Sequence, residues 1–277
     1  MPLSALALAL TAALLHASWN VLLAGARDSE AATAVATLVG VALLAPLALA
    51  TGGVQSAALP FAAASAVLHV GYLGLLARAY RGGEVSVVYP VSRGSAPVLV
   101  LVIGAVALGK GASVIQAAGV LGVSAGVFLV QSRGADPGRY ARRDLLFGLA
   151  IAVVIAGYTL VDAEGVDHAR APAYLALLLT PAAVVYAAAL WIAGRGPELR
   201  AELRPRAALT GLFLVGAYGA VLAALRLADA APVAAVRESG VVIAALMAAA
   251  FLHEPVGGRR LTGAVLVAGG VAAVALG

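Results

Sequence analysis

The sequence predicts an all-α membrane protein with ten transmembrane helices in two inverted five-helix repeats. The first observation is composition: the 277 residues are 63% hydrophobic and only 11% charged. A soluble domain carries about 25% charged residues, so this chain lacks the polar side chains to cover a surface in water. The other two observations are the number of long apolar runs and an internal duplication.

Apolar runs of the right length recur along the whole chain. A helix needs about 20 mainly apolar residues to cross the hydrocarbon core of a bilayer. Ten segments meet this condition, namely 3–23, 31–50, 58–80, 85–106, 112–131, 144–164, 172–193, 207–227, 231–251 and 258–276. We therefore expect each of them to form one spanning helix.

A polar stretch divides these segments into two sets of five. Residues 132–143, SRGADPGRYARR, carry four arginines, a proline and two glycines between apolar runs. We expect a first five-helix repeat over 1–131, a basic linker over 132–143 and a second five-helix repeat over 144–277.

The two sets are similar in sequence. Shifting the chain by 144 residues aligns VSVVYPVSRGSAP at 85–97 with the segment that contains APVAAVRESGV at 231–241. The aligned identities include Arg93 with Arg237, Ser95 with Ser239, Gly119 with Gly263, and Gly126 with Gly270. Matches in order at one offset indicate an internal duplication. Because five is odd, the second copy must cross the membrane in the opposite direction, as in many secondary transporters.

Basic residues favour alternate loops. The loops after the first, third, fifth, seventh and ninth segments hold 13 of the 18 lysines and arginines, and the remaining loops hold three. Cytoplasmic loops of membrane proteins are enriched in lysine and arginine. The charge distribution therefore predicts that the arginine-rich loops are cytoplasmic and that both termini lie outside.

Polar side chains inside the apolar segments identify a candidate site. A charged side chain in hydrocarbon costs a few kcal/mol, so it usually faces a cavity or a partner. Eight residues are candidates for substrate binding: Trp19, Asn20, Tyr72, Tyr89, Arg93, Tyr158, Tyr218 and Arg237. Four others are candidates for proton coupling or gating: Glu238, Asp162, His16 and His69.

The depth of these residues predicts two separate clusters. Arg93 and Asn20 lie toward the arginine-rich side, whereas Asp162, Arg237 and Glu238 lie toward the other side, where two gates would be. Neighbouring helical residues point about 100° apart, so Arg237 and Glu238 should face different partners, one of them Asp162. Plainer alternatives remain for these residues, including a backbone partner for Arg93 and packing roles for the histidines and aromatic residues.

Motifs for other functions are missing from the sequence. It contains no P-loop, HExxH or GxSxG pattern and no cysteine. We expect no enzymatic activity, no cofactor and no metal site.

Three stretches carry a resemblance to a known family. HASWNVLL at 16–23, VVYPVSRGSAP at 87–97 and the region from RESGVVIAAL at 237–246 to LHEP at 252–255 resemble the EamA-like family of the drug/metabolite transporter superfamily. The resemblance implies ten helices in two repeats and small-molecule transport. This sequence has Lys110 where that family commonly has a loop glutamate, and the family is usually drawn with both termini in the cytoplasm.

These observations lead to one expected function and two alternatives. We expect a secondary transporter of the bacterial inner membrane that exports a small polar or amphipathic metabolite or drug by alternating access through a central cavity. Its partners would be membrane lipid, the substrate and protons as the candidate coupling ion. A membrane-embedded enzyme and a lipid-head-group flippase remain the alternatives.

Overall fold

The computed structural model describes residues 1–82, 85–131, 142–252 and 257–277, with only the backbone described for 80–82, 85–86 and 248–252. Ten of its helical segments are long and apolar enough to cross a membrane, as predicted. Each predicted helix end lies within two residues of an observed one. The helices are α1 (Leu3–Ala24), α2 (Ser29–Thr51), α3 (Ala58–Gly82), α4 (Val85–Leu108), α5 (Val114–Gln131), α6 (Arg142–Gly165), α7 (Ala171–Ile192), α8 (Gly196–Ala201), α9 (Pro205–Leu225), α10 (Ala230–Arg237), α11 (Gly240–Leu252) and α12 (Gly258–Leu276).

One predicted helix is interrupted. The segment expected over 231–251 is two helices, α10 and α11, with a break at Glu238 and Ser239. At the break, the amides of Glu238 and Ser239 donate to carbonyls only three residues earlier, at 3.1 and 3.0 Å. This spacing tightens the turn relative to an α-helix. The equivalent helix in the first half, α4, remains continuous although it contains Pro90 and Pro97.

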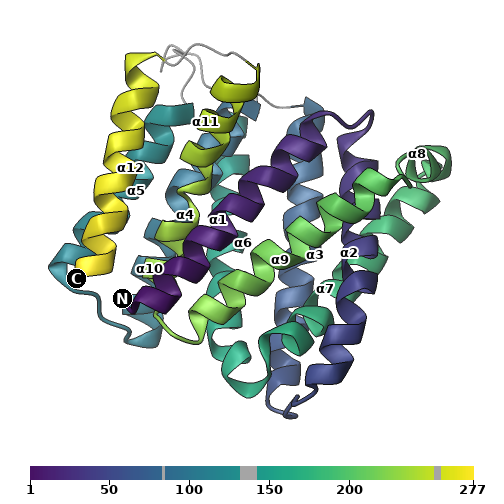
Figure 1. Ribbon diagram of the computed structural model, residues 1–277, viewed down its shortest axis with the longest axis horizontal. Coiled ribbons are helices and arrows are strands. Elements are labelled where there is room, and N and C mark those ends of the chain that lie inside the picture. The colour runs from purple at the N-terminus through teal and green to yellow at the C-terminus, as the bar shows by residue number, and fades with distance from the viewer. Residues whose placement is uncertain (83–84, 132–141, 253–256) are drawn as a thin grey trace.

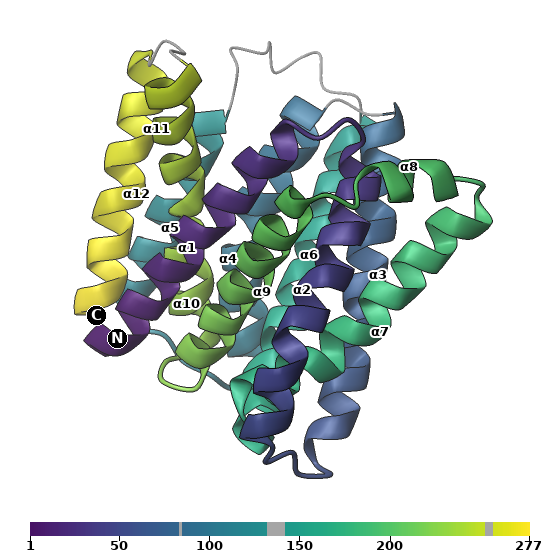
Figure 2. The same ribbon diagram turned by 45° about the vertical axis from the view of Figure 1, so that its right-hand side comes forward.

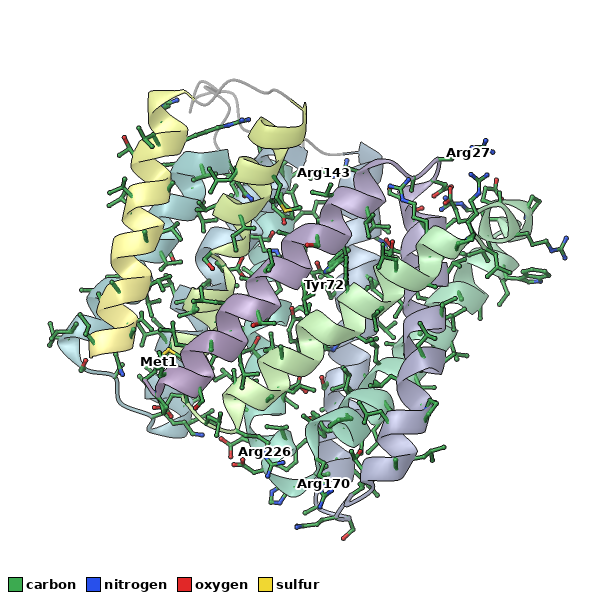
Figure 3. The ribbon with its side chains drawn as sticks, viewed as in Figure 1. Met1, Arg27, Tyr72, Arg143, Arg170 and Arg226 are labelled. Carbon is green, nitrogen blue, oxygen red and sulfur yellow. The ribbon has the colours of Figure 1, made fainter. Side chains whose placement is uncertain are left out.

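The two halves run in opposite directions. α1 leads away from the end of the molecule that holds both termini, and α6 leads back toward it (Figures 1 and 2). Figure 3 shows Arg27 and Arg143 at one end, and Arg170 and Arg226 at the other. The packing follows the same symmetry, because α1 contacts α9 as α6 contacts α3. The fold is therefore the predicted pair of inverted five-helix repeats.

Glycines allow the last helix of each repeat, α5 and α12, to cross at very short range. A Cβ atom on Gly119 would lie 2.7 Å from the carbonyl oxygen of Gly270, and one on Gly270 would lie 2.7 Å from that of Gly119. Gly126 and Gly263 face each other in the same way, at 2.6 and 2.7 Å. Gly263 and Gly270 are the equivalents of Gly119 and Gly126 at the 144-residue offset, so the two contacts are equivalent by the repeat symmetry. This equivalence supports the duplication. Small residues at such crossings bring helix backbones together in membranes.

An ion-pair cluster joins the start of α2 to the loop after α7. The carboxylate of Asp28 accepts from the amides of Glu30 and Ala31 at 3.1 and 3.0 Å, which caps α2. Arg195 pairs with both Asp28 and Glu30. Burial alone would raise the pKa of Asp28, but the bonds from Ala31 and Arg195 outweigh it and lower that pKa below its ordinary value.

Removing the Arg195 side chain should weaken this end of the protein. We expect Arg195→Ala to lower the free energy of unfolding by about 1 kcal/mol at neutral pH. Because the pKa of Asp28 is lower when folded, its contribution is present above the unfolded pKa and is lost as pH falls through the folded value. Unfolding in detergent at about pH 7 and about pH 3 measures both effects. Arg27→Ala, which removes an exposed neighbouring arginine, is the control; a loss of equal size in both variants would contradict the assignment.

Candidate functional site at the break between two helices

The break between α10 and α11 places three polar residues, Arg237, Glu238 and Ser239, inside the membrane-spanning region. Arg237 is the last residue of α10, which starts at Ala230. At 1.5 Å per residue, Arg237 is roughly 10 Å from the start of that helix, well inside a core about 30 Å thick. All three residues are buried, and α1 and α4 pack against this region.

Two arginines share one carboxylate at this break. Nη1 of Arg93 on α4 donates to Oε1 of Glu238 at 3.5 Å, and Nη2 of Arg237 donates to the same oxygen at 3.2 Å. The side chains of Arg93, Arg237 and Glu238 are 7%, 6% and 3% exposed. The cluster of Arg93, Arg237 and Glu238 therefore holds two positive charges and one negative charge.

His16 on α1 completes the cluster. Its Nε2 lies 2.7 Å from Nη2 of Arg93. A guanidinium group can only donate, so this ring nitrogen accepts and His16 is the neutral imidazole. His16 thus adds a hydrogen bond to Arg93 but no negative charge.

Two donors at the break are unused. Among the described residues, Nε of Arg237 and Oγ of Ser239 are buried and lack a hydrogen-bond partner. A buried donor without a partner costs about 1–3 kcal/mol, so such groups commonly mark a place where water or a ligand binds.

A small cavity of about 30 Å³ opens onto the cluster. Its lining comes from α1, α4, the break and the start of α11, and consists of His16, Ala17, Asn20, Tyr89, Arg93, Arg237, Glu238, Gly240, Val241 and Ala244. This volume is enough for a water molecule or two but is too small for a metabolite.

Aromatic and amide side chains surround the cluster. The guanidinium carbon of Arg93 lies 5.6 Å from the ring centroid of Tyr89, which is within cation–π range. Trp19 meets the His16 ring edge-on at 4.9 Å. The amide nitrogen of Asn20 donates to the carbonyl of His16 at 2.7 Å. These contacts orient the side chains that face the cavity.

A second polar cluster forms around Asp162 on α6. The carboxylate accepts from the hydroxyl of Tyr174 on α7 at 3.0 Å and from the hydroxyl of Tyr218 on α9. A side-chain hydrogen bond from Ser65 on α3 also reaches it. Asp162 is completely buried, so these neutral donors replace the water that would otherwise solvate the charge.

Aromatic rings connect the second cluster with the first. His69 stacks on Tyr158 at 4.4 Å and meets Tyr218 edge-on at 5.3 Å. Tyr158 meets Tyr72 edge-on at 6.3 Å and Tyr218 at 6.0 Å. Tyr158 and Tyr218 also interact electrostatically with Arg237. These rings therefore extend from Asp162, which Tyr218 contacts, toward Arg237.

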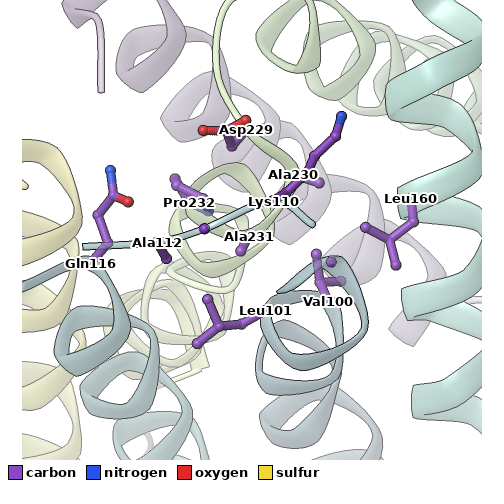
Figure 4. A pocket seen from close by; sticks show the side chains of 12 residues that line it. Val100, Leu101, Lys110, Ala112, Gln116, Leu160, Asp229, Ala230, Ala231 and Pro232 are labelled. Carbon is purple, nitrogen blue, oxygen red and sulfur yellow. The ribbon is translucent and has the colours of Figure 1, made fainter. Parts of the chain in front are cut away.

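A further pocket of about 20 Å³ lies at the end of the molecule that holds the termini. Figure 4 shows Lys110, Gln116 and Asp229 around a mostly apolar lining from α4, α5, α6 and α10. Lys110 pairs with Glu164 at the end of α6, which links the two halves. The first residues of α10 line this pocket and its last residue lines the cavity at the break.

The structure corrects the predicted separation of the charged residues. Arg93, Arg237 and Glu238 form one cluster rather than lying in two gates. Neither Arg237 nor Glu238 bridges to Asp162, whose observed partners are hydroxyl groups. The prediction was wrong because it assumed a regular helix, in which the two neighbours diverge, whereas the break turns both toward α4.

Four contributing residues were not identified from the sequence: Ser65, Tyr174, Ser239 and Glu164. Ser65 lies four residues before His69 on one helix face, so spacing could have found it. Tyr174 reaches Asp162 only through the tertiary packing of α7, which lies mainly against α2 and α3, and the sequence carries no signal for that packing. Within the described part of the chain, no three His, Cys, Asp or Glu side chains gather as metal ligands.

The fold and the buried charged cluster define a multi-pass integral membrane protein with the architecture of a transporter. The chain belongs to the EamA-like transporter family, whose sequence profile matches residues 3–132 and 143–276. A protein of known crystal structure has the same fold, with a TM-score of 0.79 and 19% sequence identity over 100% of this chain and 98% of the other. No curated protein matches this chain in sequence.

Proposed function

We propose that this transporter exports a small organic anion or zwitterion across the bacterial inner membrane by alternating access. The observation that carries the proposal is the sharing of Glu238 by Arg93 and Arg237 at the helix break. A buried charge costs several kcal/mol unless it is paired. The anionic group of a substrate would supply the missing negative charge.

The unused donors favour a carboxylate. Nε of Arg237 and Oγ of Ser239 lie at the same break, and guanidinium groups bind carboxylates through parallel hydrogen bonds. Tyr89 and Trp19 would offer ring faces to an apolar part of the substrate. Tyr72, Tyr158 and Tyr218 would do the same at a greater distance from the cavity. Asn20 would contribute a polar contact at the cavity.

The size and position of the cavity support the proposal of alternating access. A space of about 30 Å³ cannot hold a metabolite, so the site must enlarge to bind one. On the side of the termini, α10 and the Lys110–Glu164 ion pair stand between the cavity and the membrane surface. We propose that these contacts separate when the site opens to that side, and that the arginine-rich end faces the cytoplasm.

Arg93→Gln should remove most of the affinity for anions. Loss of a charge-assisted hydrogen bond corresponds to about 1.5–3 kcal/mol, so we expect binding at least about 10-fold weaker. Purified protein is titrated with L-glutamate, L-phenylalanine and tetraphenylphosphonium while its thermal unfolding is followed. L-Glutamate and L-phenylalanine should stabilise the native protein against thermal unfolding, whereas tetraphenylphosphonium should not.

The matched control is Arg226→Gln, which removes an exposed arginine far from the cavity. It should retain native affinity. Export is then tested by efflux of the bound compound from proteoliposomes, and an Arg93→Gln protein that binds and moves it at the native rate would overturn the proposal. Movement of labelled lipid without movement of any of the three probes would instead favour a flippase.

A further inference from the structure

Asp162 differs in its partners from Glu238, a second carboxylate that is buried in the transmembrane region. Glu238 has two guanidinium groups beside it. Asp162 is completely buried and is held by the hydroxyls of Tyr174 and Tyr218, and among the described residues no lysine or arginine forms an ion pair with it. Unlike Glu238, Asp162 can therefore become neutral without leaving a partner cation unpaired.

The energetic consequence of protonation is opposite at the two sites. A proton on Glu238 would leave Arg93 and Arg237 close together in a buried site without their counter-ion, which is unfavourable. A proton on Asp162 would remove a buried charge, and the neutral carboxyl could still accept from Tyr174 and donate to another oxygen. Proton uptake and release is therefore far less costly at Asp162.

An imidazole lies beside this carboxylate. Nδ1 of His69 is 2.9 Å from the carbonyl of Ser65 and 3.3 Å from its hydroxyl, and that hydroxyl also reaches Asp162. Histidine is the side chain whose charge ordinarily changes between about pH 5 and pH 8. Ser65 thus connects two groups that can each carry a proton.

Both halves of the protein contribute to this cluster. Ser65 and His69 belong to α3 of the first half, and Asp162, Tyr174 and Tyr218 belong to α6, α7 and α9 of the second. A movement of one half against the other would alter the hydrogen bonds of Asp162. The titratable and charged groups that face Asp162 and His69 are Tyr158, Tyr174, Tyr218 and Arg237.

We propose that Asp162, with His69, is a proton-binding site separate from the anion site. One carboxylate oxygen takes a proton from a hydronium ion on the side to which the site is open, and releases it to water on the other side. Asp162 and Arg237 both act electrostatically on Tyr218 and on His69, so the charge of one cluster is felt at the other. The coupling of this proton to substrate rests on the proposed function, whereas the proton site itself does not.

Infrared titration tests the proton site without any substrate. Native protein in detergent should show a protonated-carboxyl C=O band whose intensity changes with pH. Asp162→Asn should abolish that band, and Asp167→Asn, which removes an exposed carboxylate five residues later, should leave it unchanged. A native protein without the band, or a band that survives in Asp162→Asn, would overturn the proposal.

A second variant keeps the test valid if Asp162→Asn does not fold. His69→Gln retains the carboxyl group and should shift the pH midpoint of the same band, because the neighbouring ionisable group is gone. An unchanged midpoint would show that His69 does not belong to the site. Gel filtration establishes that each variant remains folded.

Binding of L-glutamate at several pH values tests the coupling. Native affinity should change by at least about 3-fold over the range in which the band titrates, and the affinity of Asp162→Asn should stay constant. A native affinity that does not vary with pH would exclude coupling but leave the infrared result intact. Failure of L-glutamate and L-phenylalanine to bind at any pH would count against the proposed function, and the infrared titration would still decide the proton site.

Discussion

Glu238→Gln is expected to destabilise the protein by about 3–5 kcal/mol, because breaking a buried ion pair leaves uncompensated charge. In this protein the substitution leaves two guanidinium groups, those of Arg93 and Arg237, without the carboxylate that both contact. Neither side chain can turn to water, since they are 7% and 6% exposed. SDS-induced unfolding of the purified protein measures the loss.

A double-mutant cycle separates the repulsion between Arg93 and Arg237 from the other effects of Glu238→Gln. Arg93→Gln alone leaves Arg237 and Glu238 as a balanced pair, so it should cost less than Glu238→Gln. The combination of both should cost less than the sum of the two, because it removes the repulsion between the arginines. Additive losses, or a larger loss for Arg93→Gln than for Glu238→Gln, would contradict the shared carboxylate.

Gly270→Ala should cost about 1–3 kcal/mol by forcing α5 and α12 apart. The added methyl would lie 2.7 Å from both the carbonyl oxygen of Gly119 and the amide nitrogen of Val123. Both are backbone atoms, so no side-chain rotation can relieve the contact. The melting temperature in detergent should fall accordingly.

The adjacent glycine is the control for this prediction. A Cβ on Gly269 would meet nothing within 4 Å, so Gly269→Ala should change stability by less than about 0.5 kcal/mol. The repeat symmetry adds a second condition, because Gly126 is the equivalent of Gly270 and has equally short contacts. Gly126→Ala should therefore resemble Gly270→Ala, and a loss confined to one helix would argue against equivalent crossings.

Most of the architecture could be predicted from local sequence properties. Apolar runs of about 20 residues, arginines in alternate loops and matched glycines at a constant offset were sufficient for ten helices in two opposed sets. The glycines that match between the two halves, Gly119, Gly126, Gly263 and Gly270, all lie at the α5–α12 crossing. These features depend on the length and composition of segments and on their repetition along the chain, so they can be read without knowing how the helices pack.

The partners of the polar residues could not be predicted in the same way. The polar residues at helix spacing, such as Tyr89 and Arg93, do lie on one face near the cavity. The sequence shows no proline at the α10–α11 break, so nothing in it indicated that Arg237 and Glu238 would meet Arg93. Tyr174 likewise reaches Asp162 only through the tertiary packing of α7, which lies mainly against α2 and α3 of the first half.

By itself, the sequence determined that this chain spans a membrane ten times as two similar, oppositely directed halves, because hydrophobicity and repetition are properties of the chain. Only the tertiary structure decided that Arg93, Arg237 and Glu238 form one cluster while Asp162 forms another. The reason is that a buried charge is paired by whichever side chain the packing brings within about 4 Å, and this choice depends on helix breaks and crossings between distant segments.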